Sequence, residues 1–314
     1  MISEKNDISI LVEAARLYYE HDFSQQQIAY KLGISRPSVS RILHKAREQG
    51  IVKIEIKDPS DKGIRIENDL KKKYDLKKIF VVPEDDNIAV VKERLGQAAY
   101  RMLNEIITDD IILGISWGTT MQEVARQSAR KMMKNLTVVQ LNGGVSKAAL
   151  DTHASEIAQT LGEKFQATPY LLPLPAIVDS PRVKKVILSD KNIARTLDLG
   201  KRADIAMYTI GLFNRESVLV KADYFEKQEI KSLLKNGAIG DICSRIVDHD
   251  GNICSQTLNA RTIGIEQKDL LKKPYAIAVA GGKEKLPAIR AAIRGNWFNC
   301  LITDSWISNE LLHD

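Results

Sequence analysis

Residues 23–47 constrain the fold of this chain most, because their apolar spacing and turn residues fit two short helices joined by a tight turn. Ser24 followed three residues later by Gln27 forms a capping box, which predicts the start of the first helix. Gly33 tolerates the left-handed backbone that a tight turn requires, and Ser35 then caps a second helix. The segment therefore predicts a helix-turn-helix.

The predicted second helix has an apolar stripe of Val39, Ile42 and Leu43, and its opposite face is polar and basic. In a DNA-reading helix-turn-helix that face is the recognition surface, where N-terminal residues reach base edges and flanking cations meet phosphates. The alternative is an ordinary helical hairpin with a solvated basic face. The residues we expect to contact DNA are Arg36, Pro37, Ser38, Ser40, Arg41 and Lys45.

The 314 residues exceed one typical domain, so we expect two domains. The formal net charge of +6 is too mild to indicate nucleic-acid binding by itself, but four cations and one anion fall within residues 35–48. No apolar stretch approaches the roughly 18 residues of a membrane span, and the first thirty residues hold no signal-peptide core. The sequence therefore predicts a cytoplasmic protein with no membrane partner.

The three cysteines have no CxxC spacing, which indicates reduced thiols that serve as small hydrophobic residues. The five histidines are isolated along the chain, and none has a second candidate ligand at zinc-like spacing. We expect no metal site, no cofactor and no catalytic residue.

Residues 8–20 have apolar residues at helical intervals and predict a third helix for the DNA-binding unit. Ile51, Ile54 and Ile56 are interleaved with charged residues, which favours a short strand or wing, and Asp58-Pro59 marks its end. The expected domains are 1–58 for DNA binding, 59–77 as a linking helix, and 78–314 for effector binding and oligomerisation.

Beyond residue 78, apolar runs alternate with helical stretches, the pattern of a parallel sheet with crossover helices. The predicted fold class is thus an N-terminal helix-turn-helix followed by a Rossmann-like α/β domain. The predicted strands are 79–82, 111–115, 136–141, 205–210, 276–280 and 301–303, and the predicted helices include 121–132, 154–165, 227–235 and 288–294. Residues 242–247 and 252–254 predict a β-hairpin around the turn at 248–251.

Three predicted strands end in glycine-bearing turns that lead toward helices, at residues 116–120, 142–144 and 281–285. In an open α/β sheet, ligands bind beyond the carboxyl ends of the strands, and free amides at a helix start favour an anion. Threonine hydroxyls in the first turn and Lys285 in the third would complete a phosphate cradle. For each turn taken alone, the alternative is a glycine needed only for chain geometry.

Several segments, in order along nearly the whole chain, carry a resemblance to a known family: SQQQIAYKLGISRPSVSRIL, LGISWGTTM, VVQLNGG, GDICSR with GNIC, RTIG and VAGGKEK. The chain resembles the SorC/DeoR-type sugar-binding transcriptional regulators, most closely the deoxyribonucleoside regulators of Gram-positive bacteria. The resemblance implies an effector domain similar to phosphosugar isomerases and glucosamine-phosphate deaminases. It also implies a homodimer or homotetramer whose partners are double-stranded operator DNA and a phosphorylated sugar.

The three turns and the resemblance together give the expected effector-binding residues. The set is Ser116, Gly118, Thr119, Thr120, Asn142, Gly143, Gly144, Asp241, Gly281, Gly282 and Lys285. One position departs from the resemblance: the deoxyribonucleoside regulators have a lysine just before the glycine pair, and this chain has Asn142. A lysine can form a Schiff base with an aldehyde sugar, whereas an asparagine only donates and accepts hydrogen bonds. Covalent capture is therefore not expected, and the departure counts against deoxyribose phosphate as the effector.

The favoured function is a transcriptional regulator that represses a carbohydrate or deoxyribonucleoside catabolic operon and is released by a noncovalently bound phosphosugar. The alternative is an active sugar-phosphate isomerase or deaminase that carries a DNA-binding head. Such catalysis needs a second proton-relaying group beside the first, and Asp241 is the only evident candidate acid or base. A purely structural oligomerisation domain would leave the three glycine turns unexplained.

Overall fold

A computed structural model describes residues 3–52, 62–145 and 152–314 of the chain. The chain divides into two compact units, Met1–Pro59 and Ser60–Asp314. No helix in the described ranges is long and apolar enough to cross a membrane.

The first unit contains three helices, α1 (Ser3–Tyr19), α2 (Gln25–Leu32) and α3 (Arg36–Glu48). The predicted capping box is confirmed, because the Ser24 hydroxyl accepts from the Gln27 amide and the Gln27 side chain accepts from the Ser24 amide. Gly33 has a φ of 65°, in the left-handed region, and the Ser35 side chain caps α3. Buried side chains from all three helices form one small core, with Leu17 on α1, Ile28 on α2 and Leu43 on α3.

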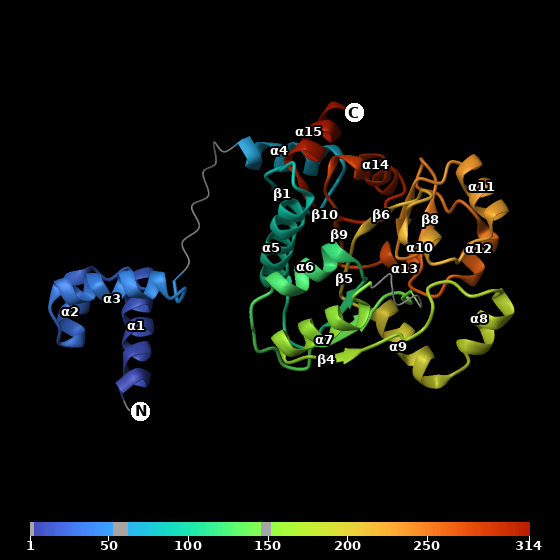
Figure 1. Ribbon diagram of the computed structural model, residues 1–314. Coiled ribbons are helices and arrows are strands. Elements are labelled where there is room, and N and C mark those ends of the chain that lie inside the picture. Colours follow the sequence, from blue (N-terminus) through green and yellow to red (C-terminus); the bar gives the residue numbers. More distant parts are fainter. Residues whose placement is uncertain (1–2, 53–61, 146–151) are drawn as a thin grey trace. The chain divides into compact units, whose positions relative to one another are not determined.

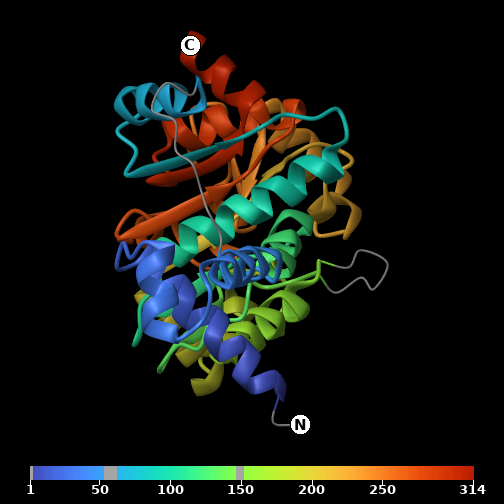
Figure 2. The same ribbon diagram turned by 90° about the vertical axis from the view of Figure 1, so that its left-hand side faces the viewer.

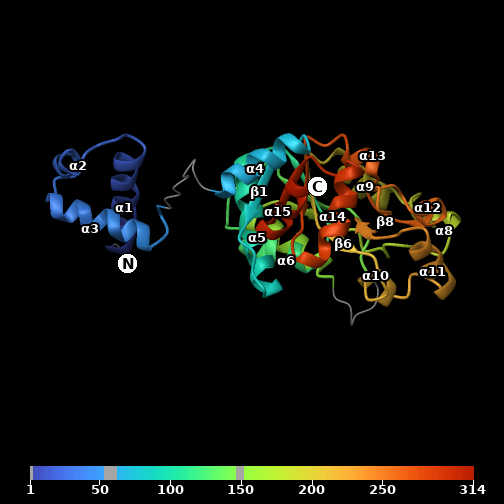
Figure 3. The same ribbon diagram turned by 90° about the horizontal axis from the view of Figure 1, so that it is seen from above.

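The wing predicted for residues 51–56 lies mostly outside the described residues, as does the turn at Asp58-Pro59. Ile51 and Val52 are described, and they pack against a buried cluster formed by α1 and α3. The predicted linking segment contains helix α4 (Lys62–Lys73), which packs against α15 (Ser305–His313) in the second unit. Figures 1, 2 and 3 all place α4 beside α15. The Lys73 ammonium fixes this contact by donating to the carbonyl oxygens of Leu311 and Leu312, at 3.1 and 3.0 Å.

The second unit is built on a seven-stranded sheet in the order β1-β10-β9-β5-β2-β3-β4, in which every neighbouring pair is parallel. The six strands predicted from apolar runs are present within a few residues of their expected bounds. Sequence analysis missed β4, an edge strand of three residues that contains Pro169. The strands are β1 (Lys78–Val82), β2 (Ile112–Ile115), β3 (Thr137–Gln140), β4 (Thr168–Tyr170), β5 (Ile205–Tyr208), β9 (Tyr275–Val279) and β10 (Cys300–Asp304).

Helices cover both faces of this sheet, so its central strands are buried on both sides (Figures 1 and 2). One face packs against α5 (Ile88–Ile106), α6 (Thr119–Gln127) and α7 (Ala154–Phe165). The other packs against α4, α14 (Leu286–Arg294) and α15. The remaining helices are α8 (Pro181–Ile187), α9 (Lys191–Arg202), α10 (Val218–Lys221), α11 (Lys227–Lys235), α12 (Gln256–Arg261), α13 (Gln267–Leu270) and the 3-10 turn η1 (Lys283–Lys285).

The predicted helix 121–132 is wrong at its end, because α6 stops at Gln127. Ser128 is in an extended conformation, and its hydroxyl donates to the Val124 carbonyl at 2.8 Å. Serine side chains compete with helical backbone bonds in this way, so the apolar spacing beyond Ser128 does not continue the helix.

A second, antiparallel sheet contains β6 (Ile210–Leu212), β7 (Gly240–Ile242) and β8 (Arg245–Val247), and it corrects two predictions. The run 205–210 is not one strand, because β5 ends at Tyr208 and Ile210 already belongs to the second sheet.

The run 242–247 is likewise interrupted, by a two-residue turn at Cys243 and Ser244 with φ of 49° and 67°. Tight hairpins of this kind need positive φ at both turn residues, and Asn-Gly is the usual signal for them. This chain uses Cys-Ser instead, so the turn could not be recognised from its residues. The predicted turn at 248–251 also forms, and an isolated bridge joins Val247 to Ile253 beyond it.

Candidate functional site

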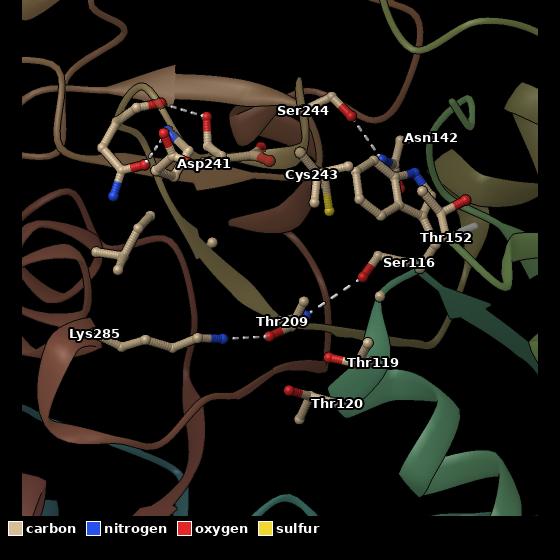
Figure 4. Close-up of a pocket in the computed structure, with 18 of the residues that line it drawn as sticks. Ser116, Thr119, Thr120, Asn142, Thr152, Thr209, Asp241, Cys243, Ser244 and Lys285 are labelled. Carbon is tan, nitrogen blue, oxygen red and sulfur yellow. Dashed lines mark hydrogen bonds between the residues drawn. The ribbon is translucent and has the colours of Figure 1, made fainter. Parts of the chain in front are cut away.

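A pocket of about 370 Å³ lies at the carboxyl ends of β2, β3 and β5, next to the turn between β7 and β8 (Figure 4). Seven of the predicted effector residues line it: Ser116, Gly118, Thr119, Thr120, Asn142, Asp241 and Lys285. The sheet thus brings together residues that are up to 169 positions apart in the sequence, as the rule for open α/β sheets predicts.

The other four predicted residues do not line this pocket. An ideal Cβ on Gly143 would lie 2.6 Å from the Pro175 carbonyl oxygen, so glycine is required there by close backbone packing. Gly144 borders a neighbouring hollow. Gly281 and Gly282 pack beside the Asp304 carboxylate, which accepts from the Gly282 amide at 2.6 Å. In this structure these glycines shape the turns around the pocket.

One end of the pocket is suited to an anion. Gly118, with a φ of 119°, stands at the start of α6 without a side-chain cap, and the threonine hydroxyls of the first turn follow directly. The Lys285 ammonium lies 3.3 Å from Thr209 Oγ1, and the Thr209 amide donates to Ser116 Oγ at 3.3 Å (Figure 4). Burial, together with repulsion from Lys92, lowers the pKa of Lys285 to about 8. At neutral pH this lysine therefore remains mostly charged.

The opposite end presents hydrogen-bond acceptors. Asp241 comes from β7, and burial raises the pKa of its carboxyl to about 7, although a backbone hydrogen bond from Ser244 and the charge of Lys285 both oppose that rise. Asn142 is 2% exposed, and its Nδ2 donates to Ser244 Oγ at 2.8 Å. Within the part of the chain that the structure describes, neither Asn142 Oδ1 nor Asp241 Oδ1 has a hydrogen-bond partner, although both atoms are buried.

Sequence reasoning missed other lining residues. Thr209 follows β5 directly, so the rule that places ligands beyond strand ends could have identified it. Ser244 lies in the unrecognised turn of the hairpin, and Glu216 and Ser217 lie just before α10, a helix of four residues that no sequence pattern indicated. The complete set of missed lining residues is Trp117, Thr152, Thr209, Gly211, Leu212, Asn214, Glu216, Ser217, Val218, Cys243, Ser244 and Glu284.

In the first unit, α3 buries Val39, Leu43 and Ala46 and leaves its other side open. Of the six predicted DNA contacts, Arg36, Pro37, Ser40 and Arg41 are exposed, and Ser38 and Lys45 are partly buried. Ser38 also takes part in the helix cap, because its amide and hydroxyl both bond to the Ser35 hydroxyl, the hydroxyl at 2.9 Å. The N-terminal half of α3 therefore presents two guanidinium groups, those of Arg36 and Arg41, beyond a capped, well-defined helix start.

Within the described ranges, no group of three or more His, Cys, Asp or Glu side chains could hold a metal ion.

Two family matches cover the chain. Residues 58–313 match the family described as "Putative sugar-binding domain", and residues 8–68 match the "Crp-like helix-turn-helix domain".

Individual relatives match over the full length. The deoxyribonucleoside regulator of Bacillus subtilis is 42% identical over 316 residues, and the match covers 100% of both chains. The sorbitol operon regulator of Klebsiella pneumoniae is 29% identical and is covered over 100% of its length and 99% of this chain.

Solved structures of transcriptional regulators also match most of the chain. The crystal structure of the full-length sorbitol operon regulator SorC from Klebsiella pneumoniae has a TM-score of 0.77 at 29% identity, covering 98% of this chain and 99% of that one. A transcriptional regulator from Streptococcus pneumoniae has a TM-score of 0.75 at 28% identity, covering 80% of this chain and 97% of that one.

Proposed function

The chain belongs to the SorC/DeoR-type sugar-binding transcriptional regulators, and we propose that it is a repressor released from its operator by a phosphorylated sugar. It is a DNA-binding transcriptional regulator, and each relative reported above is named as a regulator. In our proposal, residues 1–58 bind the operator, 59–77 link the units and 78–314 sense the effector. The genes under its control would be a carbohydrate or deoxyribonucleoside catabolic operon, a choice supported by the names of these relatives. Its place is the cytoplasm, where the operator DNA is.

The observation that carries the effector proposal is the division of the pocket into two ends. Free amides at the start of α6, threonine hydroxyls and the Lys285 ammonium suit a phosphate dianion. The acceptors of Asn142 and Asp241 at the other end suit sugar hydroxyls. Binding is noncovalent in this proposal, because position 142 carries an amide rather than an amine.

A homodimer or homotetramer is part of the proposal. One small helix-turn-helix buries too little surface for tight specific binding, and two recognition helices about one turn of DNA apart would read a repeated site. Sedimentation of the full chain would contradict this part if it gave a monomer that still bound a single half-site tightly.

The effector proposal is tested by measuring operator affinity, at fixed salt, with and without a panel of phosphosugars and their unphosphorylated parents. An effector can change DNA affinity only by binding the two conformations of the protein unequally. We expect at least one phosphosugar to weaken operator binding while its parent sugar does not. Equal action of sugar and phosphate, or a covalent adduct trapped by borohydride, would overturn the proposal.

A further inference from the structure

Two acceptor atoms at the same end of the pocket lack a donor. In the described part of the chain, the buried side-chain atoms without a hydrogen-bond partner are Gln140 Nε2, Asn142 Oδ1, Asp241 Oδ1 and Thr303 Oγ1. Asn142 and Asp241 both line the pocket, and each presents an oxygen there. Buried polar atoms are nearly always hydrogen-bonded in proteins, so a pair of unpartnered acceptors in one pocket points to donors supplied from outside the chain.

Several of the protein donors in this pocket take part in other bonds. Asn142 Nδ2 donates to Ser244 Oγ at 2.8 Å, which orients the amide with its oxygen left over. The Thr209 amide donates to Ser116, and the Lys285 ammonium lies 3.3 Å from Thr209 Oγ1. Figure 4 shows Lys285 and Asp241 as separate groups on the pocket wall. In the described part of the chain neither oxygen has a protein donor, so both are available to hydroxyl groups of a ligand.

We propose that the effector donates two hydroxyl groups, one to Asn142 Oδ1 and one to Asp241 Oδ1, from the end of the molecule opposite its phosphate. The effector is thus a sugar or polyol monophosphate that keeps its hydroxyls at the carbons farthest from the phosphate. A sugar phosphate that lacks one of them, as 2-deoxy sugars do, leaves a buried acceptor unpaired and binds more weakly. This inference rests on the proposed function, because it assumes a phosphosugar in this pocket.

Charge placement limits the effector to one phosphate. Among the residues that line the pocket, all of which the structure describes, Lys285 is the single lysine or arginine. The far end carries the Asp241 carboxyl, which repels a second phosphate whenever it is ionised. A bisphosphate therefore binds more weakly than the monophosphate of the same sugar.

The test is calorimetric titration of the full chain at pH 8 with matched pairs of probes. The pairs are ribose 5-phosphate with 2-deoxyribose 5-phosphate, glucose 6-phosphate with 2-deoxyglucose 6-phosphate, and fructose 6-phosphate with fructose 1,6-bisphosphate. We expect the hydroxylated monophosphate to bind at least about tenfold more tightly than its partner in every pair that shows binding.

Variants at position 142 then assign the effect to the acceptor. In Asn142→Ala the preference for the hydroxylated member should shrink, whereas Asn142→Asp keeps an acceptor oxygen and should retain it. Because the ratio within each pair is compared, a general loss of affinity in either variant does not obscure the result. The pairs measured on the wild-type chain decide the question even if a variant fails to fold.

Equal or tighter binding of the deoxy members, or tighter binding of the bisphosphate, would overturn this inference and leave the phosphosugar function standing. If none of the six compounds bound, the inference would fall together with the choice of a phosphosugar as effector.

Discussion

The side-chain amide of Asn142 donates a 2.8 Å hydrogen bond to the hydroxyl of Ser244, and this bond joins the loop after β3 to the turn between β7 and β8. The next residue, Arg245, is 2% exposed and donates to the backbone oxygens of Ile265, at 2.6 Å, and Gly264, at 2.9 Å. Gly264 pairs in turn with Asn142 through an isolated bridge. These contacts form a closed ring through Asn142 at the acceptor end of the pocket, so we expect a ligand that moves Asn142 to act on the hairpin turn as well.

Replacing Ser244 with alanine should destabilise the second unit. The Asn142 amide would lose its acceptor and remain buried without a partner, which costs about 1–3 kcal/mol. The double variant Ser244→Ala, Asn142→Leu removes both polar groups and should recover part of that loss. Urea unfolding of the two single variants and the double variant measures this coupling. Strictly additive losses would show that the bond does not hold the turn.

The sequence predicted the parts of the fold that depend on local chemistry. The capping box at Ser24, the left-handed Gly33 and the long apolar strands are each specified by neighbouring residues, and the structure confirms them. The Cys243-Ser244 turn could not be predicted, because its positive φ angles are imposed by the pairing of β7 with β8 rather than by residues that favour them. The missed lining residues Ser244 and Glu216 both lie in short connecting segments without a sequence signal of their own, so their place in the pocket depends on tertiary contacts.

Substitutions in the glycine pair should separate packing from binding. Gly143→Ala places a Cβ 2.6 Å from the Pro175 carbonyl oxygen and 2.7 Å from that of Leu174, and both are backbone atoms that cannot move away cheaply. We expect the free energy of unfolding to fall by about 1–3 kcal/mol or more. At Gly144 the nearest atom to a Cβ lies 3.8 Å away, so Gly144→Ala should be tolerated. Thermal unfolding compares the two, and equal melting temperatures would contradict the packing argument.

Operator binding should depend on the exposed guanidinium groups of α3. We expect Arg36→Ala and Arg41→Ala to lower operator affinity, by about 1–3 kcal/mol where the arginine reads a guanine through two bonds. A residue that reads a base also relaxes selectivity at one position, whereas a phosphate contact weakens all sequences alike. The control is Arg16→Ala on α1, which removes one positive charge from the same unit. Arg16 is exposed, and its Nε lies 3.9 Å from Glu20 Oε2. Wild-type affinity in both α3 variants at fixed salt would refute the assignment.

The response to the effector should depend on Lys285. Losing a hydrogen bond to a charged partner costs about 1.5–3 kcal/mol, so Lys285→Ala should weaken effector binding tenfold or more. Operator binding by the free protein should change little, because Lys285 belongs to the second unit. Lys283→Ala is the control, since Lys283 is exposed, does not line the pocket and lies 5.8 Å from the Trp306 ring. A normal effector response in Lys285→Ala would show that the phosphate lies elsewhere.

The pH dependence of stability should report the burial of Asp241. Burial raises the pKa of this carboxyl from its ordinary 3.8 to about 7, despite opposition from the Ser244 amide and Lys285. The folded state therefore favours the protonated acid more than the unfolded state does. Its ionisation lowers the free energy of unfolding progressively between about pH 4 and 7, and above that range the loss is complete.

Asp241→Asn cannot ionise and should escape this loss. Each pKa unit corresponds to about 1.4 kcal/mol. Between pH 4 and pH 8, the free energy of unfolding of the variant should therefore rise relative to that of the wild type by an amount on the order of a few kcal/mol. Urea unfolding at both pH values measures the difference, and taking the difference removes the contributions of other titrating groups. Asp86→Asn, at an exposed position, is the control and should run parallel to the wild type. If Asp241→Asn also ran parallel to the wild type, the pKa of the Asp241 carboxyl would not be raised by burial, and the carboxyl would be ionised over the whole range from pH 4 to pH 8.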